Sequence, residues 1–225
     1  MTAQLALRIG LRDVATFDNF ESGGNGAAVH ALRSAAEPFI YLWGAPGTGR
    51  THLLQAACHA AAAQGETPAY LPCAEIDSPE VLEGLEALTL VCLDDLHRVA
   101  GREAWESALF GFYNAARAVG TRLVVSADAG PQGLALRLPD LFSRLTWGPV
   151  FRLNPLSDEE KISALQRRAA ARGLELTSEV GAFLLRRAPR DTHALFSLLD
   201  RLDDASLVAQ RRLTIPFVRE QLHEG

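Results

Sequence analysis

One short segment of the chain combines residue types that can bind phosphate. Its sequence is 44-GAPGTGRT-51, and it lies between an apolar run ending at Trp43 and a Leu- and Ala-rich stretch beginning at His52. Its glycines let the backbone curl so that amide N–H groups point inward, where they and the following helix N-terminus can hold phosphate oxygens. Arg50 keeps a positive charge where such loops usually carry lysine, and Thr51 offers a hydroxyl to Mg²⁺. The pattern predicts a phosphate-binding loop.

A pair of carboxylates follows a second apolar run. The run 88-LTLVCL-93 has the continuous hydrophobicity of a strand covered on both faces, and Asp94 and Asp95 come directly after it. Beside a phosphate-binding loop, Asp94 could help to hold Mg²⁺ through water, and Asp95 would lie nearest to an attacking water. A lone acidic pair is often only a strand end. Together with the loop it predicts a site for ATP or ADP with Mg²⁺.

The elements that position these residues form an α/β pattern. Short apolar runs alternate with helical periodicity up to Leu153, which predicts a five-stranded parallel sheet with helices between the strands. After Asn154-Pro155 only helical patterns follow, and the first begins with a capping box from Ser157 to Glu160. The expected strands lie near residues 39–43, 69–72, 88–93, 122–126 and 150–153.

Composition limits the class of protein. The 225 residues are 48% hydrophobic and 22% charged, and the net charge of −5 gives no bulk attraction to nucleic acid. The three cysteines form no CxxC pair, which fits a reducing cytoplasm. The N-terminal residues lack the apolar stretch of a signal peptide, and no run is long enough to span a bilayer. We expect a cytoplasmic protein with no membrane partner.

Further segments resemble the AAA+ domain of the DnaA family of replication initiators. They are 16-TFDNFESGGN-25, 126-SADAGP-131 and 143-SRLTWG-148, and the resemblance covers nearly the whole chain from Ala15 onward. It implies a nucleotide-binding α/β core at 13–154 and a helical lid at 155–225. It also implies that Asp128 lies near the γ-phosphate and that Arg144 is an arginine finger, with Arg137 a weaker candidate.

The N-terminal residues 1–12 resemble a clamp-binding arm. The hexapeptide 4-QLALRI-9 is similar to the peptide by which many proteins dock onto the replicative sliding clamp. A flexible extended peptide of this kind offers one amide and alternate apolar anchors to a hydrophobic pocket. Arg8 departs from the commoner apolar residue or proline, and without its context the segment would be read as a plain N-terminal strand. The chain is also expected to lack the DNA-binding domain of the initiator.

The combination resembles a DnaA-homologous regulator that binds the β sliding clamp of DNA polymerase III. The resemblance implies that its finger enters the nucleotide site of DnaA, stimulates hydrolysis of the bound ATP and so suppresses re-initiation. Such a regulator reaches DNA, and the nucleoid of a bacterial cell, only through the clamp and DnaA. The alternative is an autonomous AAA+ ATPase such as a helicase loader. Self-association into a homo-oligomer stays open.

Two departures from the family pattern concern the nucleotide. Arg50 replaces the loop lysine, and His193 stands where the lid usually carries an arginine that reaches the phosphates; Arg190 is a substitute for that arginine. We therefore expect weak or absent intrinsic ATP hydrolysis and stable binding of ADP. On the helix containing 109-LFGFYN-114, Phe110 and Asn114 share one face and could meet the partner, although Phe110 also fits a core position.

The resulting predictions name four groups of residues. The nucleotide site consists of Gly44, Pro46, Gly47, Thr48, Gly49, Arg50, Thr51, His52, Asp94, Asp95, Asp128, Arg190 and His193, with Thr51 and Asp94 as the Mg²⁺ ligands. The finger is Arg144. The clamp-binding residues are Gln4, Leu5, Leu7 and Ile9, and the partner interface contains Phe110 and Asn114. His97 could line the cleft, but a lone histidine in such a place is more often an ordinary surface residue.

Overall fold

The structure is a computed structural model that describes residues 15–187, 192–209 and 211–223. The chain divides into two compact units. One unit holds the sheet and comprises residues up to 20 together with 25–45 and 49–153. The other holds the C-terminal helices from residue 154 onward, together with 21–24 and 46–48.

The first unit is built on a parallel sheet of five strands. The strands are β1 (Phe39–Trp43), β2 (Pro68–Pro72), β3 (Leu90–Asp94), β4 (Arg122–Ala127) and β5 (Val150–Arg152). Their order across the sheet is β2-β3-β4-β1-β5, and every neighbouring pair is parallel. This confirms the predicted α/β fold and its five strands. Because all strands run the same way, the loops after β1, β3 and β4 emerge at one edge of the sheet.

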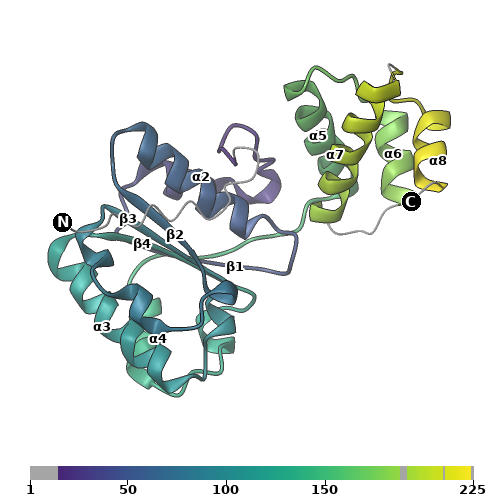
Figure 1. Cartoon of the computed structure of the whole chain (residues 1–225). Helices are drawn as coiled ribbons and strands as arrows, with labels where there is room; N and C mark the ends of the chain where they lie inside the picture. Colours follow the sequence, from purple (N-terminus) through teal and green to yellow (C-terminus); the bar gives the residue numbers. More distant parts are fainter. Residues whose placement is uncertain (1–14, 188–191, 210, 224–225) are drawn as a thin grey trace. The chain divides into compact units, whose positions relative to one another are not determined.

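Helices cover both faces of this sheet (Figure 1). Helices α1 (Gly26–Ser34) and α2 (Arg50–Ala63) pack on one face, and α3 (Glu103–Val119) and α4 (Pro139–Leu145) pack on the other. Alternate residues of β1 pack into the hydrophobic layers on the two faces of the sheet, since successive side chains of a strand point to opposite faces. Ile40 belongs to the cluster with α1 and α2, whereas Tyr41 belongs to the cluster with α3 and α4.

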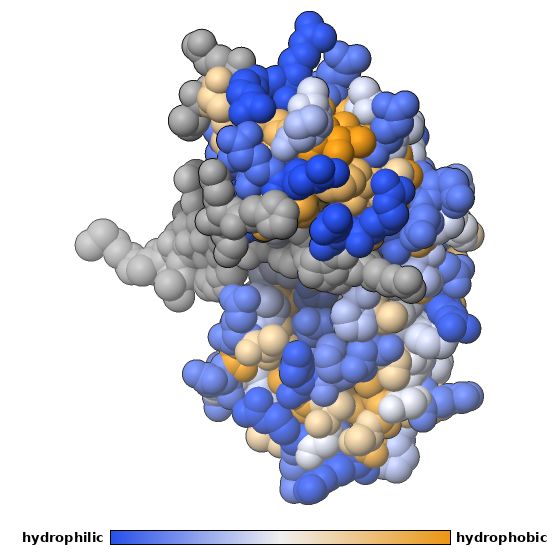
Figure 2. Space-filling model, turned by 90° about the vertical axis from the view of Figure 1, so that its right-hand side faces the viewer, coloured by the Kyte–Doolittle hydropathy of each residue, from blue (hydrophilic) through white to orange (hydrophobic). Residues whose placement is uncertain are grey.

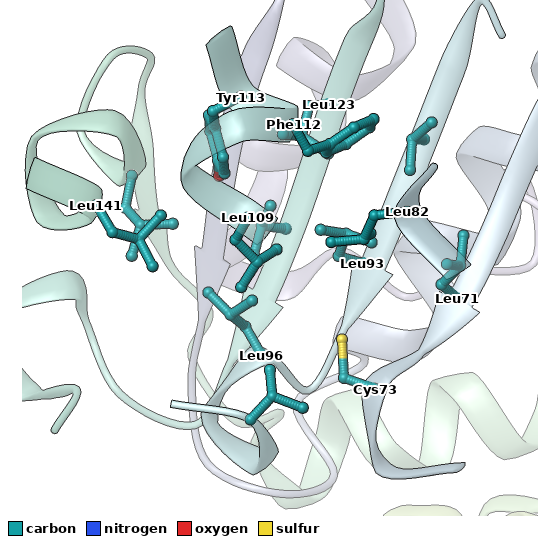
Figure 3. Close-up of a cluster of buried hydrophobic side chains, with 14 of the residues drawn as sticks. Leu71, Cys73, Leu82, Leu93, Leu96, Leu109, Phe112, Tyr113, Leu123 and Leu141 are labelled. Atoms are coloured by element: carbon teal, nitrogen blue, oxygen red, sulfur yellow. The ribbon is translucent and has the colours of Figure 1, made fainter. Parts of the chain in front are cut away.

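The layer beneath α3 contains the larger of the two core clusters in this unit (Figure 3). Leu109, Phe112 and Tyr113 project from α3 towards the strands. Leu141 belongs to the same cluster and comes from α4. Apolar burial of this kind contributes about 1.5–3 kcal/mol for each large side chain. It fixes α3 and α4 on the same face of the sheet.

The second unit contains four helices in its described part. They are α5 (Asp158–Ala171), α6 (Ser178–Arg187), α7 (Thr192–Ala209) and α8 (Ile215–His223). The predicted capping box is confirmed: the Ser157 hydroxyl accepts a hydrogen bond from the Glu160 amide, and the Glu160 carboxylate accepts one from the Ser157 amide. A separate apolar core joins the helices, with Leu165, Leu184 and Leu199 fully buried.

The surface carries few large apolar side chains. Within the described residues, only Val119 and Val150 are large hydrophobic residues with high exposure. Hydrophilic and hydrophobic residues are interspersed on the face shown in Figure 2. A search of the described helices found none with the length and apolar character needed to cross a membrane.

Candidate functional site

The phosphate-binding loop connects β1 to α2 and depends on glycine. Gly47 and Gly49 have φ angles of 80° and 91°, a left-handed region that side chains with a Cβ rarely adopt. Gly49 is the residue before α2, and a Cβ there would lie 2.5 Å from Cε2 of Phe20. The loop backbone therefore has the curled form expected of a phosphate cradle, and it leads directly into a helix N-terminus.

Arg50 forms the most specific contacts of the predicted nucleotide site. Its Nη1 donates to the carbonyl oxygen of Gly44 over 2.6 Å, and its Nη2 donates to Oδ1 of Asp95 over 2.9 Å. Only 10% of the side chain is exposed. The guanidinium thus joins the loop after β1 to the end of β3, and it neutralises the carboxylate that was expected to lie nearest to an attacking water.

Asp94 is buried and already has three hydrogen-bond donors. Its Oδ2 accepts from the Tyr70 hydroxyl over 2.7 Å, and its Oδ1 accepts from the Asp95 amide over 3.1 Å and from the Ser126 hydroxyl. Burial raises the pKa of the Tyr70 hydroxyl, and the charge of Asp94 raises it further. Tyr70 therefore stays a proton donor to this carboxylate.

The hydrogen bonds to Asp94 leave its carboxylate little capacity to bind magnesium. A carboxylate has about four lone-pair positions, and three donors engage this one. Thr51 is exposed. Within the described ranges, no cluster of three or more His, Cys, Asp or Glu side chains is arranged to hold a metal ion. The ligation of Mg²⁺ by Thr51 and Asp94 stays a prediction.

Asp95, His97 and Asp128 lie together at this edge of the sheet. Asp95 has a φ of 57°, unusual for a residue other than glycine, and such strain is concentrated at functional sites. Nδ1 of His97 lies 3.8 Å from Oδ1 of Asp95, and Nε2 lies 3.6 Å from Oδ2 of Asp128. The Asp128 amide also donates to Nδ1 of His97 over 3.3 Å. His97 thus links the ends of β3 and β4, rather than being an isolated surface residue.

The opening segment is tied to α2 through His52. Its Nε2 lies 2.9 Å from the carbonyl oxygen of Thr16, and its ring lies 5.3 Å from that of Phe20. Of the remaining predicted loop residues, Gly44 and Thr48 are buried and Pro46 is exposed.

Several predicted site residues cannot be placed. The clamp-binding residues Gln4, Leu5, Leu7 and Ile9 and the lid residue Arg190 all lie outside the described residues. His193 belongs to α7, but its side chain also lies outside the described part.

A second group of predicted residues meets on α3 and α4. Nε of Arg144 donates to Oδ1 of Asn114 over 3.2 Å, and its guanidinium carbon lies 4.7 Å from the ring centroids of both Phe110 and Trp147. Arg117 lies over the Trp147 ring as well, 4.5 Å from its centroid. The residues predicted as finger and as partner interface thus lie together. With Arg117 and Trp147 they form a group that we call the finger cluster: Phe110, Asn114, Arg117, Arg144 and Trp147.

Glu106 is a residue that the sequence reasoning missed. It is 1% exposed, and its carboxylate accepts hydrogen bonds from the backbone amides of Gly101, Arg137 and Leu138. A signal was available, because Glu106 falls three residues before Leu109 and seven before Tyr113, on the apolar face of its helix. A carboxylate at such a position needs hydrogen-bond donors from elsewhere in the fold.

Comparison with known families shows what the C-terminal helices are similar to. Residues 158–222 match the family model described as "Hda, lid domain". The chain is Hda-like. Its other unit is a parallel-sheet core, and solved structures show that the fold is that of AAA+ proteins.

The core and lid together resemble known AAA+ structures. Domain III of DnaA from Thermotoga maritima has a TM-score of 0.81 and 21% identity over 96% of this chain and 98% of that chain. AMPPCP-bound DnaA from Aquifex aeolicus has a TM-score of 0.73 and 24% identity over 85% and 66%. A mutant of RuvB from Thermotoga maritima has a TM-score of 0.71 and 17% identity over 93% and 71%. At these identities the likeness establishes the AAA+ fold.

The Hda-like chain covers only part of some DnaA chains that it matches. It spans 65% and 66% of two DnaA chains that were solved with AMPPCP, which is just under two thirds of their length. The activity and partners of those proteins can therefore only be proposed for this chain.

The glycine at the start of α2 gives a test of the nucleotide site in this Hda-like chain. We expect Gly49→Ala to lower the affinity for ADP about tenfold or more, equivalent to roughly 1.4 kcal/mol, because the new Cβ strains the loop and displaces Phe20. Titration calorimetry with ADP measures the change. Gly65→Ala is the matched control, since Gly65 has a φ of 81° but its Cβ would meet nothing within 4 Å. Equal loss in both variants would contradict the role of the loop.

Proposed function

We propose that this Hda-like chain is a clamp-bound negative regulator of replication initiation that stimulates hydrolysis of the ATP bound to DnaA. The observation that carries the proposal is the finger cluster. Arg144 lies within hydrogen-bonding distance of Asn114 and against the ring of Phe110, so the predicted finger meets the predicted partner interface, which was chosen on a different ground. The Hda lid supports the same role.

Arg144 would act in trans on the nucleotide of DnaA. A guanidinium brought to the transferring phosphoryl group stabilises the charge that develops there, and an arginine finger raises the rate by roughly 10³–10⁵, or about 4–7 kcal/mol. In this structure the guanidinium of Arg144 contacts the rings of Phe110 and Trp147. Cation–π contacts at exposed sites are worth only about 0.5–1 kcal/mol each. To draw the side chain out, the partner would have to replace these ring contacts and the hydrogen bonds to Asn114 and Ser143.

The nucleotide site of the chain itself would hold ADP as a structural ligand. DnaA structures with the same fold contain the ATP analogue AMPPCP, and the curled loop with its glycines supports nucleotide binding here. The ion pair between Arg50 and Asp95 argues against hydrolysis. It removes the free carboxylate that would face an attacking water, and it holds the loop cation away from a γ-phosphate. Asp128, Arg190 and His193 remain proposed contacts of the nucleotide.

Residues 1–12 would attach the chain to the β sliding clamp through Gln4, Leu5, Leu7 and Ile9. Residues 13–154 would form the nucleotide-binding core, and residues 155–225 the lid. The net charge of −5 supports an indirect route to DNA through the clamp and DnaA, because the chain has no excess of cations to neutralise phosphates.

The decisive experiment is turnover of ATP by DnaA with the clamp loaded on DNA. We expect hydrolysis to accelerate only when DnaA, clamp, DNA and this chain are all present, and the chain alone to show little turnover. A variant that lacks residues 1–12 should keep its thermal unfolding midpoint, because the proposal treats them as an extended docking arm rather than as part of the core. It should lose stimulation together with clamp binding.

Two outcomes would contradict the proposal. Turnover by the chain alone, unchanged by DnaA, would identify an autonomous ATPase such as a helicase loader. Stimulation that survives deletion of residues 1–12 would separate the regulator from the clamp and refute the assignment of the arm.

A further inference from the structure

The carboxylate of Glu106 is placed where α3 meets the start of α4. It accepts hydrogen bonds from the amide of Gly101 over 2.7 Å, from that of Arg137 over 2.9 Å and from that of Leu138 over 2.6 Å. Leu138 is the residue that precedes α4, and Pro139 opens this helix. Glu106 therefore holds the chain at the point where α4 begins.

The buried carboxylate of Glu106 needs groups that compensate its charge. A buried charge is costly unless hydrogen bonds or an opposite charge compensate it. Among the described residues, no arginine, lysine or histidine forms an ion pair with Glu106. Its compensation comes from three backbone amides, and hydrogen bonds to a charged acceptor are stronger than those to a neutral one. Such bonds also fix geometry, because backbone donors cannot rotate as side chains do.

The same face of α3 contacts α4 at a second point. Glu106, Phe110 and Asn114 are spaced by four residues and so lie along one face of the helix. Glu106 binds the start of α4, whereas Phe110 and Asn114 contact Arg144 in its last turn. The two contacts together fix both the position of α4 and its rotation about its own axis.

We propose that Glu106 is a positioning residue for Arg144, which orients α4 so that the finger is presented before any partner binds. This inference rests on the proposed function of Arg144. Preorganisation of this kind matters because a displacement of about 1 Å in a catalytic group can lower a rate by about 10²-fold. Because Glu106 is buried, it would act through Arg144 rather than by contacting nucleotide or partner.

The test is Glu106→Gln, which keeps the shape of the side chain but turns one acceptor oxygen into a donor facing backbone amides. We expect the maximal stimulation of DnaA to fall about 10²-fold at saturating protein. The concentration that gives half-maximal stimulation should change less than about twofold, because the contacting residues remain. Glu103→Gln is the matched control, since it lies exposed in the same first turn of α3. Phe110→Ala removes both a proposed partner contact and a ring that contacts Arg144, so it should raise the half-maximal concentration as well as lower the maximal stimulation.

A second measurement does not depend on DnaA. Hydrogen exchange should accelerate at least about tenfold at residues 136–146 in Glu106→Gln, while β3 and β4 keep their protection. Unchanged exchange there together with full stimulation would overturn the proposal. An equal loss of protection across the whole core would show a general structural role and overturn it too. Glu106→Asp keeps the charge on a shorter stem and replaces the glutamine variant if that variant fails to fold; it should show the same local pattern with a smaller amplitude.

The two proposals fail in different ways. If the unmodified chain does not stimulate DnaA at all, the proposed function fails, while the exchange experiment still decides whether Glu106 holds α4. If the unmodified chain stimulates DnaA and Glu106→Gln does so equally well, only the positioning role fails.

Discussion

Replacing Arg144 by alanine should lower the stimulated hydrolysis of DnaA-bound ATP by roughly 10³-fold or more, because the guanidinium that would stabilise charge on the transferring phosphoryl group is then missing. The fold should survive. Arg144 contributes hydrogen bonds to Asn114 and Ser143 and stacks on two rings at a half-buried site, and losing such contacts costs about 1–2 kcal/mol. Turnover in the complete assembly of DnaA, clamp and DNA measures the first effect, and thermal unfolding measures the second.

Neighbouring arginines provide the matched controls for this variant. Arg117→Ala removes the other guanidinium that contacts the Trp147 ring, and Arg137→Ala removes the weaker finger candidate. Both should retain most of the stimulation. Arg144→Lys keeps the charge but loses the planar fork of donors, so we expect it to remain severely impaired. Full stimulation by Arg144→Ala, or its loss in Arg137→Ala instead, would place the finger elsewhere.

Replacing Gly148 by alanine should destabilise the core by about 3 kcal/mol or more. The added Cβ would lie 1.7 Å from the carbonyl oxygen of Phe39 and 2.6 Å from its carbonyl carbon. Phe39 belongs to β1, which pairs with β4 on one side and β5 on the other, so the backbone has no direction in which to yield. The unfolding midpoint should fall by roughly 6–12 °C for a chain of this size.

Gly111→Ala is the control for this stability measurement. Gly111 lies within α3 and an added Cβ would meet nothing within 4 Å, so the substitution should raise stability by about 1 kcal/mol through helix propensity. A Gly148→Ala variant with an unchanged midpoint would show that α4 and β5 can separate from β1. Gly148, which ends the segment 143-SRLTWG-148, would then have no structural role at this contact.

The sequence by itself determined the local features of this protein. The continuous apolar run before Asp94 predicts a buried strand, and the structure has β3 there. The capping box at Ser157 and Glu160 is present as predicted, because both partners lie within one turn. The same holds for the glycine-rich loop, whose left-handed backbone at Gly49 follows from the residue type. Periodicity and local hydrogen bonds need no knowledge of distant residues.

Only the tertiary structure decided which side chains became partners. Arg50 pairs with Asp95, 45 residues away, because β3 and β1 are both adjacent to β4 in the sheet and end at the same edge. Glu106 binds the amides before α4, about 30 residues away, because α3 and α4 pack on the same face. Neither contact follows from spacing along the chain. Strand order and helix packing bring these groups together, and the need to satisfy a buried charge then selects the partner.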